Sequence, residues 1–107
     1  MNKSAQEVMW NAVTEKDLRQ TVTDLAHHLD WDVWWTWTSI HSPPDFPDLT
    51  LVRCKRLIFA ELKTQTGKVT PGQQRCLDLL GACAETYVWR PSDMDESETM
   101  TIPEILT

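Results

Sequence analysis

Two apolar runs joined by a short basic turn constrain this chain more than any other feature. They occupy residues 48–53 and 56–63, within the stretch DLTLVRCKRLIFAELK, and their Leu, Val, Ile and Phe content is typical of buried β-strands. Because only Cys54–Lys55 separates them, the runs predict an antiparallel hairpin. Cys-Lys is an unfavourable two-residue turn, but a longer symmetric turn preserves the same register.

The register of this hairpin brings charged side chains together. A turn centred between the runs pairs Arg53 with Arg56. At the other end of the strands it places Asp48 directly opposite Glu61, with Lys63 on the same face two residues later. Two opposed carboxylates repel each other and destabilise a sheet. A divalent cation between them reverses that effect, and hard oxygen ligands favour Mg²⁺ or Mn²⁺.

Lys63 adds a positive charge beside this predicted metal site. A lysine in such a place orients water and stabilises the charge that develops on phosphate oxygens, so the pattern predicts metal-assisted hydrolysis of a phosphodiester. The alternative is that Asp48 and Glu61 lie at solvated strand ends and that Lys63 pairs with one of them, as is common on sheet surfaces. The apolar residues on both strands favour burial of the group.

The flanking segments predict the rest of an α/β fold. Apolar residues at helical spacing predict a helix over 15–29, and alternating Trp and Val residues predict a strand over 31–37. The capping sequence TPGQ begins a second helix at 70–73, and ETYVWR predicts a last strand over 85–90. We therefore expect one domain over 1–107, with a small mixed sheet flanked by helices in the order helix, three strands, helix, strand.

Charge and composition limit the classes of partner. The net charge of −6 counts against nucleic acid, but the five acids after Arg90 have no Lys or Arg among them, which leaves residues 1–90 at −1. Charge therefore neither supports nor excludes DNA. The sequence contains no run of membrane-spanning length and no secretory leader, so we expect a cytoplasmic protein without a membrane partner. Three cysteines without CxxC spacing indicate reduced thiols.

Pro47-Asp48 followed by Glu61-Leu62-Lys63 resembles the PD-(D/E)xK nuclease signature. The segments FPDLTLVR, LIFAELKTQTGKVTPGQQ and YVWRPSD are similar to the VRR-NUC branch, the virus-type replication-repair nucleases. The resemblance covers about residues 15–93 and leaves an acidic tail over 94–107. It implies a restriction-endonuclease-like core and a Mg²⁺- or Mn²⁺-dependent endonuclease, in a bacterial or phage-infected cell.

The resemblance also implies roles for individual residues. Asp48 and Glu61 match the metal ligands of these nucleases, with the Leu62 backbone carbonyl as a third. Lys63 matches the catalytic lysine. These four positions make up the centre of the predicted site.

Two further positions complete the site in such nucleases. Glu15 matches the acid of the first helix, a possible further metal ligand; its alternative role is to favour the positive end of that helix. Gln73 matches the glutamine after the ExK strand; its alternative role is only to close a capping box with Thr70. Two positions depart from the family pattern, because Asp45 stands where relatives have glycine and Trp35 where they have histidine.

The expected partner is DNA, in a branched or otherwise structured form such as a junction or flap. Candidate contacts to nucleic acid are the basic residues around the turn and second helix and one loop histidine: Arg53, Lys55, Arg56, Lys68, Arg75 and His41. Six tryptophans favour a large core or a homodimer interface over a base-stacking surface. Two alternatives remain, a catalytically silent nucleic-acid-binding or assembly module and an RNA endonuclease.

Overall fold

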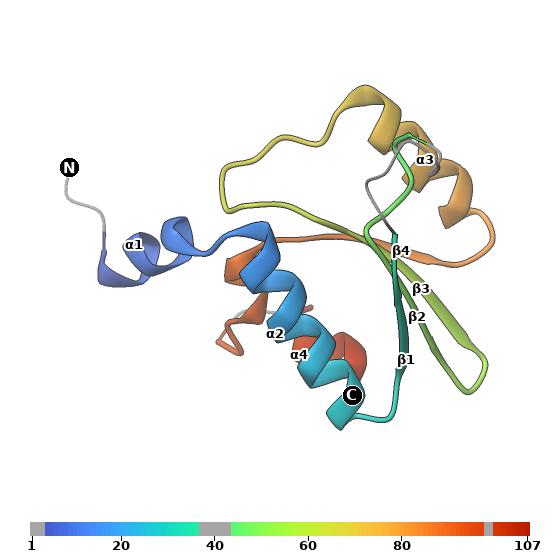
Figure 1. Cartoon of the computed structure of the whole chain (residues 1–107), viewed down its shortest axis with the longest axis horizontal. Helices are drawn as coiled ribbons and strands as arrows, with labels where there is room; N and C mark the ends of the chain where they lie inside the picture. The colour runs from blue at the N-terminus through green and yellow to red at the C-terminus, as the bar shows by residue number, and fades with distance from the viewer. Residues whose placement is uncertain (1–3, 37–43, 98–99) are drawn as a thin grey trace.

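The computed structural model describes residues 4–36, 44–97 and 100–107 (Figure 1). His41 and Trp37 lie outside the described residues. The helices are α1 (Ala5–Ala12), α2 (Glu15–His28), α3 (Pro71–Gly81) and α4 (Ile102–Leu106), with a 3-10 turn η1 (Pro91–Met94). The strands are β1 (Asp32–Trp35), β2 (Leu49–Arg53), β3 (Arg56–Leu62) and β4 (Glu85–Trp89). No helix in these ranges has the length and apolar character needed to cross a membrane.

The strands form one mixed sheet in the order β1-β2-β3-β4. The first three strands are antiparallel to their neighbours, and β4 runs parallel to β3. A parallel pair needs a crossover connection, which α3 supplies. The predicted class and mixed sheet are confirmed, but the predicted order was incomplete. The elements from α2 to β4 follow it, whereas α1 precedes them and η1 and α4 follow them.

The hairpin register agrees with the sequence prediction. Arg53 pairs with Arg56 beside the turn, and Leu49 pairs with Ala60 at the other end of the ladder. The turn is two residues long, and Cys54 takes a φ of 54°, which non-glycine residues seldom adopt. The strand pairing therefore imposes an unfavourable conformation on the turn.

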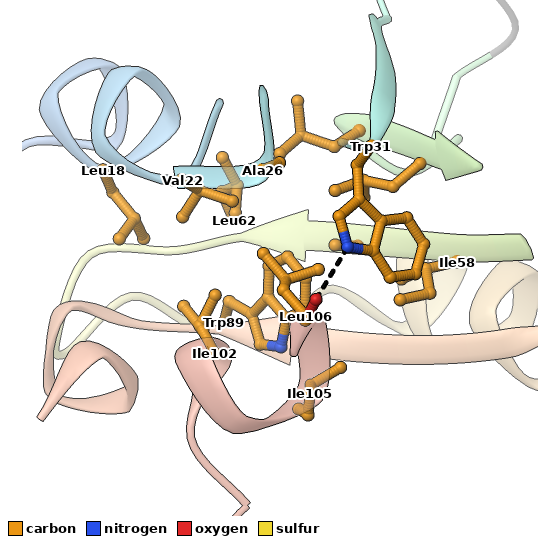
Figure 2. Packing of buried hydrophobic residues seen from close by; sticks show 13 residues of the cluster. Leu18, Val22, Ala26, Trp31, Ile58, Leu62, Trp89, Ile102, Ile105 and Leu106 are labelled. Atoms are coloured by element: carbon orange, nitrogen blue, oxygen red, sulfur yellow. Dashed lines mark hydrogen bonds between the residues drawn. The ribbon is translucent and has the colours of Figure 1, made fainter. Parts of the chain in front are cut away.

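One face of the sheet forms the core. Its inward side chains lie against α2 and α4, which converge on β3 and β4 (Figure 2). The buried cluster is Leu18, Val22, Ala26, Trp31, Leu49, Leu51, Ile58, Ala60, Leu62, Trp89, Ile102, Ile105 and Leu106. The last three come from α4, within the acidic segment over 94–107. The apolar residues of α4 carry this segment into the core.

Basic and aromatic side chains hold α4 in place through its backbone carbonyls. Trp31 Nε1 donates to the Leu106 carbonyl at 2.8 Å (Figure 2), and Arg53 Nη1 donates to the same oxygen at 2.9 Å. Arg56 Nη1 donates to the Ile105 carbonyl at 2.8 Å. Both guanidinium groups also stack on the Trp31 ring, 4.7 and 5.1 Å from its centroid. The last carbonyls of the helix, which have no partner within it, are satisfied in this way.

The other face of the sheet is covered by α3 over β4. A Cβ placed on Gly81 of α3 would lie 3.1 Å from Thr86 Oγ1 of β4, which shows how closely the two elements approach. Trp34 lies in register with Thr50 and Phe59 on this face, and its side chain is 58% exposed. The tryptophans therefore divide, since Trp31 is buried in the core while Trp34 faces solvent.

Candidate active site

The structure brings Asp48 and Glu61 together on the sheet face opposite the core. Asp48 directly precedes β2, and its Oδ2 accepts a hydrogen bond from the Leu62 amide at 2.7 Å. Glu61 is the penultimate residue of β3 and is only 3% exposed. A glutamate in such a position is unusual, because burial of a carboxylate is costly unless the charge is compensated.

The environment of Glu61 strongly favours its protonated form. Burial is the first cause, followed by the negative charge of Asp48 and hydrogen bonding with it, and together they raise the pKa of Glu61 to about 8. Lys63 opposes this shift, and Glu15 adds to it. The pair Asp48 and Glu61 therefore needs either a proton or a cation.

The two oxygens of Glu61 have different surroundings. Glu61 Oε1 accepts a hydrogen bond from Gln73 Nε2 at 3.2 Å and lies 3.7 Å from Lys63 Nζ. Glu61 Oε2 is buried and accepts no hydrogen bond from the described residues. Its contact with Asp48 becomes a hydrogen bond only when the pair holds a proton, because two ionised carboxylates have no donor between them. Buried polar atoms are seldom left in this state, so the orphaned oxygen is a candidate ligand atom.

Gln73 closes the capping box of α3 and also contacts Glu61. Its Oε1 accepts from the Thr70 amide at 2.9 Å, and Thr70 Oγ1 accepts from the Gln73 amide at 3.1 Å, so the capping box of α3 is complete. The Nε2 group of the same side chain is thereby directed to Glu61. The cap fixes the orientation of the amide, and the amide orients the carboxylate.

Glu15 adds negative charge near the site but is not itself buried. It is the first residue of α2, after the N-cap Thr14, and its side chain is exposed. Its negative charge raises the pKa of Glu61, so it faces the same site. Within residues 4–36, 44–97 and 100–107, however, no three His, Cys, Asp or Glu side chains approach closely enough to hold a metal ion. The structure thus brings two carboxylates together and leaves Glu15 outside them.

The residues present fit a Mg²⁺ or Mn²⁺ ion of the kind that keeps most of its waters. Such ions bind through one or two carboxylates together with substrate phosphates. Asp48 and Glu61 supply the carboxylates, and the orphaned Oε2 of Glu61 supplies an unused oxygen. Leu62, whose amide holds Asp48, is the source of the expected backbone ligand.

A hydrogen-bonded loop holds the segment after Lys63. Arg90 Nη1 donates to the carbonyls of Thr64 and Gly67 at 2.8 and 2.5 Å. Gln65 and Ser92 exchange two hydrogen bonds, of 2.9 and 3.0 Å. The sequence analysis did not predict these contacts. Adjacent parallel strands end at the same edge of the sheet, so the polar residues that follow β3 and β4 were the feature that could have predicted them.

The basic residues predicted to contact nucleic acid are dispersed. Arg53 and Arg56 donate to the carbonyls of α4, and Arg56 also pairs with Glu85 at 2.7 Å. Lys55 is exposed at the turn, six residues along β3 from Glu61 and so roughly 20 Å from the site. Two further basic residues, Lys68 and Arg75, are exposed on the loop before α3 and on α3 itself. The guanidinium groups at the turn thus serve the fold.

The two departures from the family pattern differ in their relation to the site. Asp45 has a φ of 70°, a conformation that glycine adopts freely and that aspartate tolerates better than most residues. Trp35 lies on the core side of the sheet, where Arg19 stacks on its ring and its Nε1 donates to Thr23 Oγ1 at 3.1 Å. Trp35 therefore faces α2 on the core side of the sheet, away from the site. Asp45 lies on the segment that leads into the site, three residues before Asp48.

A separate hollow of about 430 Å³ lies between α1, α2 and η1. Its lining is mostly apolar and includes Met9, Trp10 and Met94. Asp95 is the acidic residue at its rim. The hollow lacks the paired titratable groups of the Asp48 and Glu61 site, which stays the better candidate for chemistry.

Known proteins do not identify this site. Comparisons with protein-family models, with curated proteins and with solved structures find no significant match. The chemistry of the site therefore has to follow from its own residues.

The raised pKa of Glu61 predicts how stability depends on pH without divalent metal. The folded chain holds this proton up to about pH 8, whereas the ordinary pKa is 4.5. The stabilisation is complete below pH 4.5 and is lost as pH rises toward 8, because the folded state binds more protons in that window. In EDTA, the free energy of unfolding should fall over this range by at most about 1.4 kcal/mol per pH unit.

Urea unfolding of the wild type and of Glu61→Gln at about pH 5 to 8.5, a range that spans most of the shift, measures this effect. The variant cannot lose the proton, so its stability should decline less steeply than that of the wild type. Parallel pH profiles would show that Glu61 is ionised throughout, contrary to the prediction.

Proposed function

We propose that this protein is a divalent-metal-dependent endonuclease that hydrolyses phosphodiester bonds in DNA, in structured or branched substrates met in replication, recombination or repair. The observation that carries the proposal is the buried Glu61 beside Asp48, with an orphaned oxygen and with Lys63 Nζ 3.7 Å from its other oxygen. A buried carboxylate beside a second, half-buried one costs stability, and nothing in the packing of the core requires it. A metal-binding role accounts for that cost.

Each residue has a distinct role in the proposed reaction. A bound Mg²⁺ or Mn²⁺ would supply an activated water and neutralise phosphate charge. Asp48, Glu61 and the Leu62 carbonyl would hold the ion, with the Asp48 carboxylate oriented by the Leu62 amide. Lys63 would stabilise negative charge on the phosphate oxygens. Gln73 keeps Oε1 of Glu61 engaged and leaves Oε2 for the ion.

We further propose that the elements from α2 to β4 form a restriction-endonuclease-like core of the VRR-NUC type. The order of these elements and the position of Asp48 and Glu61 at one end of β2 and β3 support this assignment. Glu15 begins α2 and acts on Glu61, and Gln73 contacts Glu61 from α3. Three of the positions implied by the resemblance, Asp48, Glu61 and Gln73, therefore lie together, and the charge of Glu15 reaches them from the start of α2.

Contacts to DNA are best supported near α3. Lys68 and Arg75 are exposed and lie close in sequence to Lys63 and Gln73, which belong to the site. Such residues would bind phosphates in a salt-dependent manner. Lys55 is a more distant contact, suited to a long substrate.

Two alternatives share parts of this site. A nucleic-acid-binding module that does not hydrolyse its ligand would use the same basic residues. It would have no use for a buried Glu61 beside Asp48, and this arrangement therefore favours the enzyme. An RNA endonuclease would share the chemistry, and the substrate panel below distinguishes it.

The metal ligands provide the first test. Labelled duplex, flap, splayed-arm and four-way-junction DNA, with matching RNA, should reveal cleavage with Mg²⁺ or Mn²⁺ and none in EDTA. Asp48→Asn or Glu61→Gln should abolish it, since each removes a charged oxygen ligand. Asp78→Asn, on the exposed side of α3, is the matched control and should cleave normally. Near-normal cleavage by either site variant would contradict the assignment of Asp48 and Glu61 as metal ligands.

Lys63 should act on the chemical step. Lys63→Ala should lower kcat by about 10²–10³-fold, the usual effect of removing one electrostatic contact in the transition state. Single-turnover kinetics at saturating DNA measures this loss, and Lys68→Ala serves as the control. If only the affinity for DNA falls and the saturated rate is unchanged, Lys63 is a phosphate-binding residue and has no part in the chemical step.

We also propose that the chain acts as a homodimer. The sheet face opposite the core carries Trp34, 58% exposed, and Leu57, 38% exposed, and Thr50 and Phe59 lie in register with Trp34. This surface is aromatic and poor in Lys and Arg, a composition that fits a protein interface better than a nucleic-acid interface. Two sites in one particle would suit the cutting of two strands.

Light scattering at micromolar concentration tests the dimer. The expected mass is about twice the single-chain 12.4 kDa. Trp34→Glu should yield the single-chain mass, because it places a charge in the proposed interface. Met9→Glu, which changes a residue on α1 that is 70% exposed, should leave the dimer intact. A wild-type mass near 12.4 kDa with full activity rules the dimer out.

A further inference from the structure

Asp45 and Gly72 fit each other at the N-terminus of α3. The carboxyl group of Asp45 occupies the space that a side chain at Gly72 would fill. A Cβ placed on Gly72 would lie 2.7 Å from the carboxyl carbon of Asp45 and 3.0 Å from its Oδ1, closer than non-bonded carbon and oxygen atoms approach. We call this the Asp45–Gly72 contact.

Each partner is a poor choice for its own local structure. Asp45 has a φ of 70°, which costs energy for any residue with a Cβ. Gly72 lies in the first turn of α3, where glycine lowers helix stability relative to alanine. No glycine among the described residues has a positive φ, so the backbone at Gly72 does not require glycine. An added Cβ there would instead have to displace the Asp45 carboxyl group, which lies at the end of an exposed side chain.

The contact joins the two segments that build the candidate site. On one side, Asp45 leads through Phe46 and the buried Pro47 to Asp48. Phe46 packs edge-on against Phe59 of β3, with ring centroids 5.6 Å apart. On the other side, Gly72 precedes Gln73, whose amide donates to Glu61. A carboxylate at this end of α3 is also favoured by the helix dipole.

We propose that Asp45 is a positioning residue of this site. It acts through Gly72 to keep the first turn of α3 against the loop before Asp48, and this keeps Gln73 Nε2 on Glu61 Oε1. The effect on turnover rests on the proposed nuclease function. The effect on the orientation of Gln73 does not, and it can be measured without substrate.

The first experiment follows the side-chain amide resonances of Gln73 by ¹⁵N NMR, assigned by their loss in Gln73→Glu. Gly72→Ala forces the Asp45 carboxyl group away, and Asp45→Gly removes it. Both variants should shift the Gln73 resonances in the same direction. The double variant should match Asp45→Gly, because no carboxyl group is left for the added methyl group to displace. Asp45→Asn, which keeps the shape of the side chain and tolerates positive φ, should retain the wild-type resonances.

Leu79→Ala is the control. It truncates a 59% exposed side chain near the other end of α3 and should leave the Gln73 resonances unchanged. Unchanged resonances in both Gly72→Ala and Asp45→Gly would overturn the proposal. A shift in Gly72→Ala but not in Asp45→Gly would overturn it as well, since the added methyl group would then act without Asp45.

The second experiment measures turnover on whichever substrate the wild type cleaves. Gly72→Ala and Asp45→Gly should each lower kcat by about 3- to 30-fold, with KM changed by less than about twofold, because a small displacement of a positioned group slows the chemical step. Their effects should not multiply in the double variant. A wild type that cleaves nothing while the Gln73 resonances respond as expected would overturn the nuclease proposal and leave the positioning role standing.

Discussion

The pairing register of β2 and β3 is the constraint on which the rest of the structure depends. A shift of β3 by one residue against β2 would turn Ile58, Ala60 and Leu62 away from the core and would carry Glu61 into it. The observed register places the apolar set against α2 and α4 and leaves the carboxylates on the opposite face. The cost appears at the turn, where Cys54 takes a positive φ. Core and candidate site are thus two consequences of one pairing.

The site is stable in the fold because its polar groups are held from several directions. The Leu62 amide orients Asp48, Gln73 orients one oxygen of Glu61, and Lys63 offsets part of the negative charge. These contacts do not fully offset the cost of ionising the buried Glu61 carboxyl group, so its pKa rises to about 8. A site with this remaining imbalance is suited to a cation, since a cation stabilises the pair without a change in the surrounding structure.

The two arginines beside the hairpin turn have a structural role that the sequence did not indicate. From the sequence, Arg53 and Arg56 resembled phosphate-binding residues on an exposed hairpin. In the structure they stack on Trp31 and donate to the carbonyls at the end of α4. Arginine is suited to this work because its planar group offers several donors and an aromatic-stacking surface at once. The acidic tail thereby becomes part of the core.

The sequence by itself determined the hairpin, its register, the cap of α3 and the opposition of Asp48 to Glu61, because these depend on local spacing and on alternation along a strand. Tertiary structure decided what depends on distant segments meeting. It buried Glu61, directed the capping glutamine Gln73 onto it, and left Glu15 outside the carboxylate pair. It also brought α4 into the core. No local pattern encodes these contacts, since each joins residues whose proximity depends on the packing of the whole sheet.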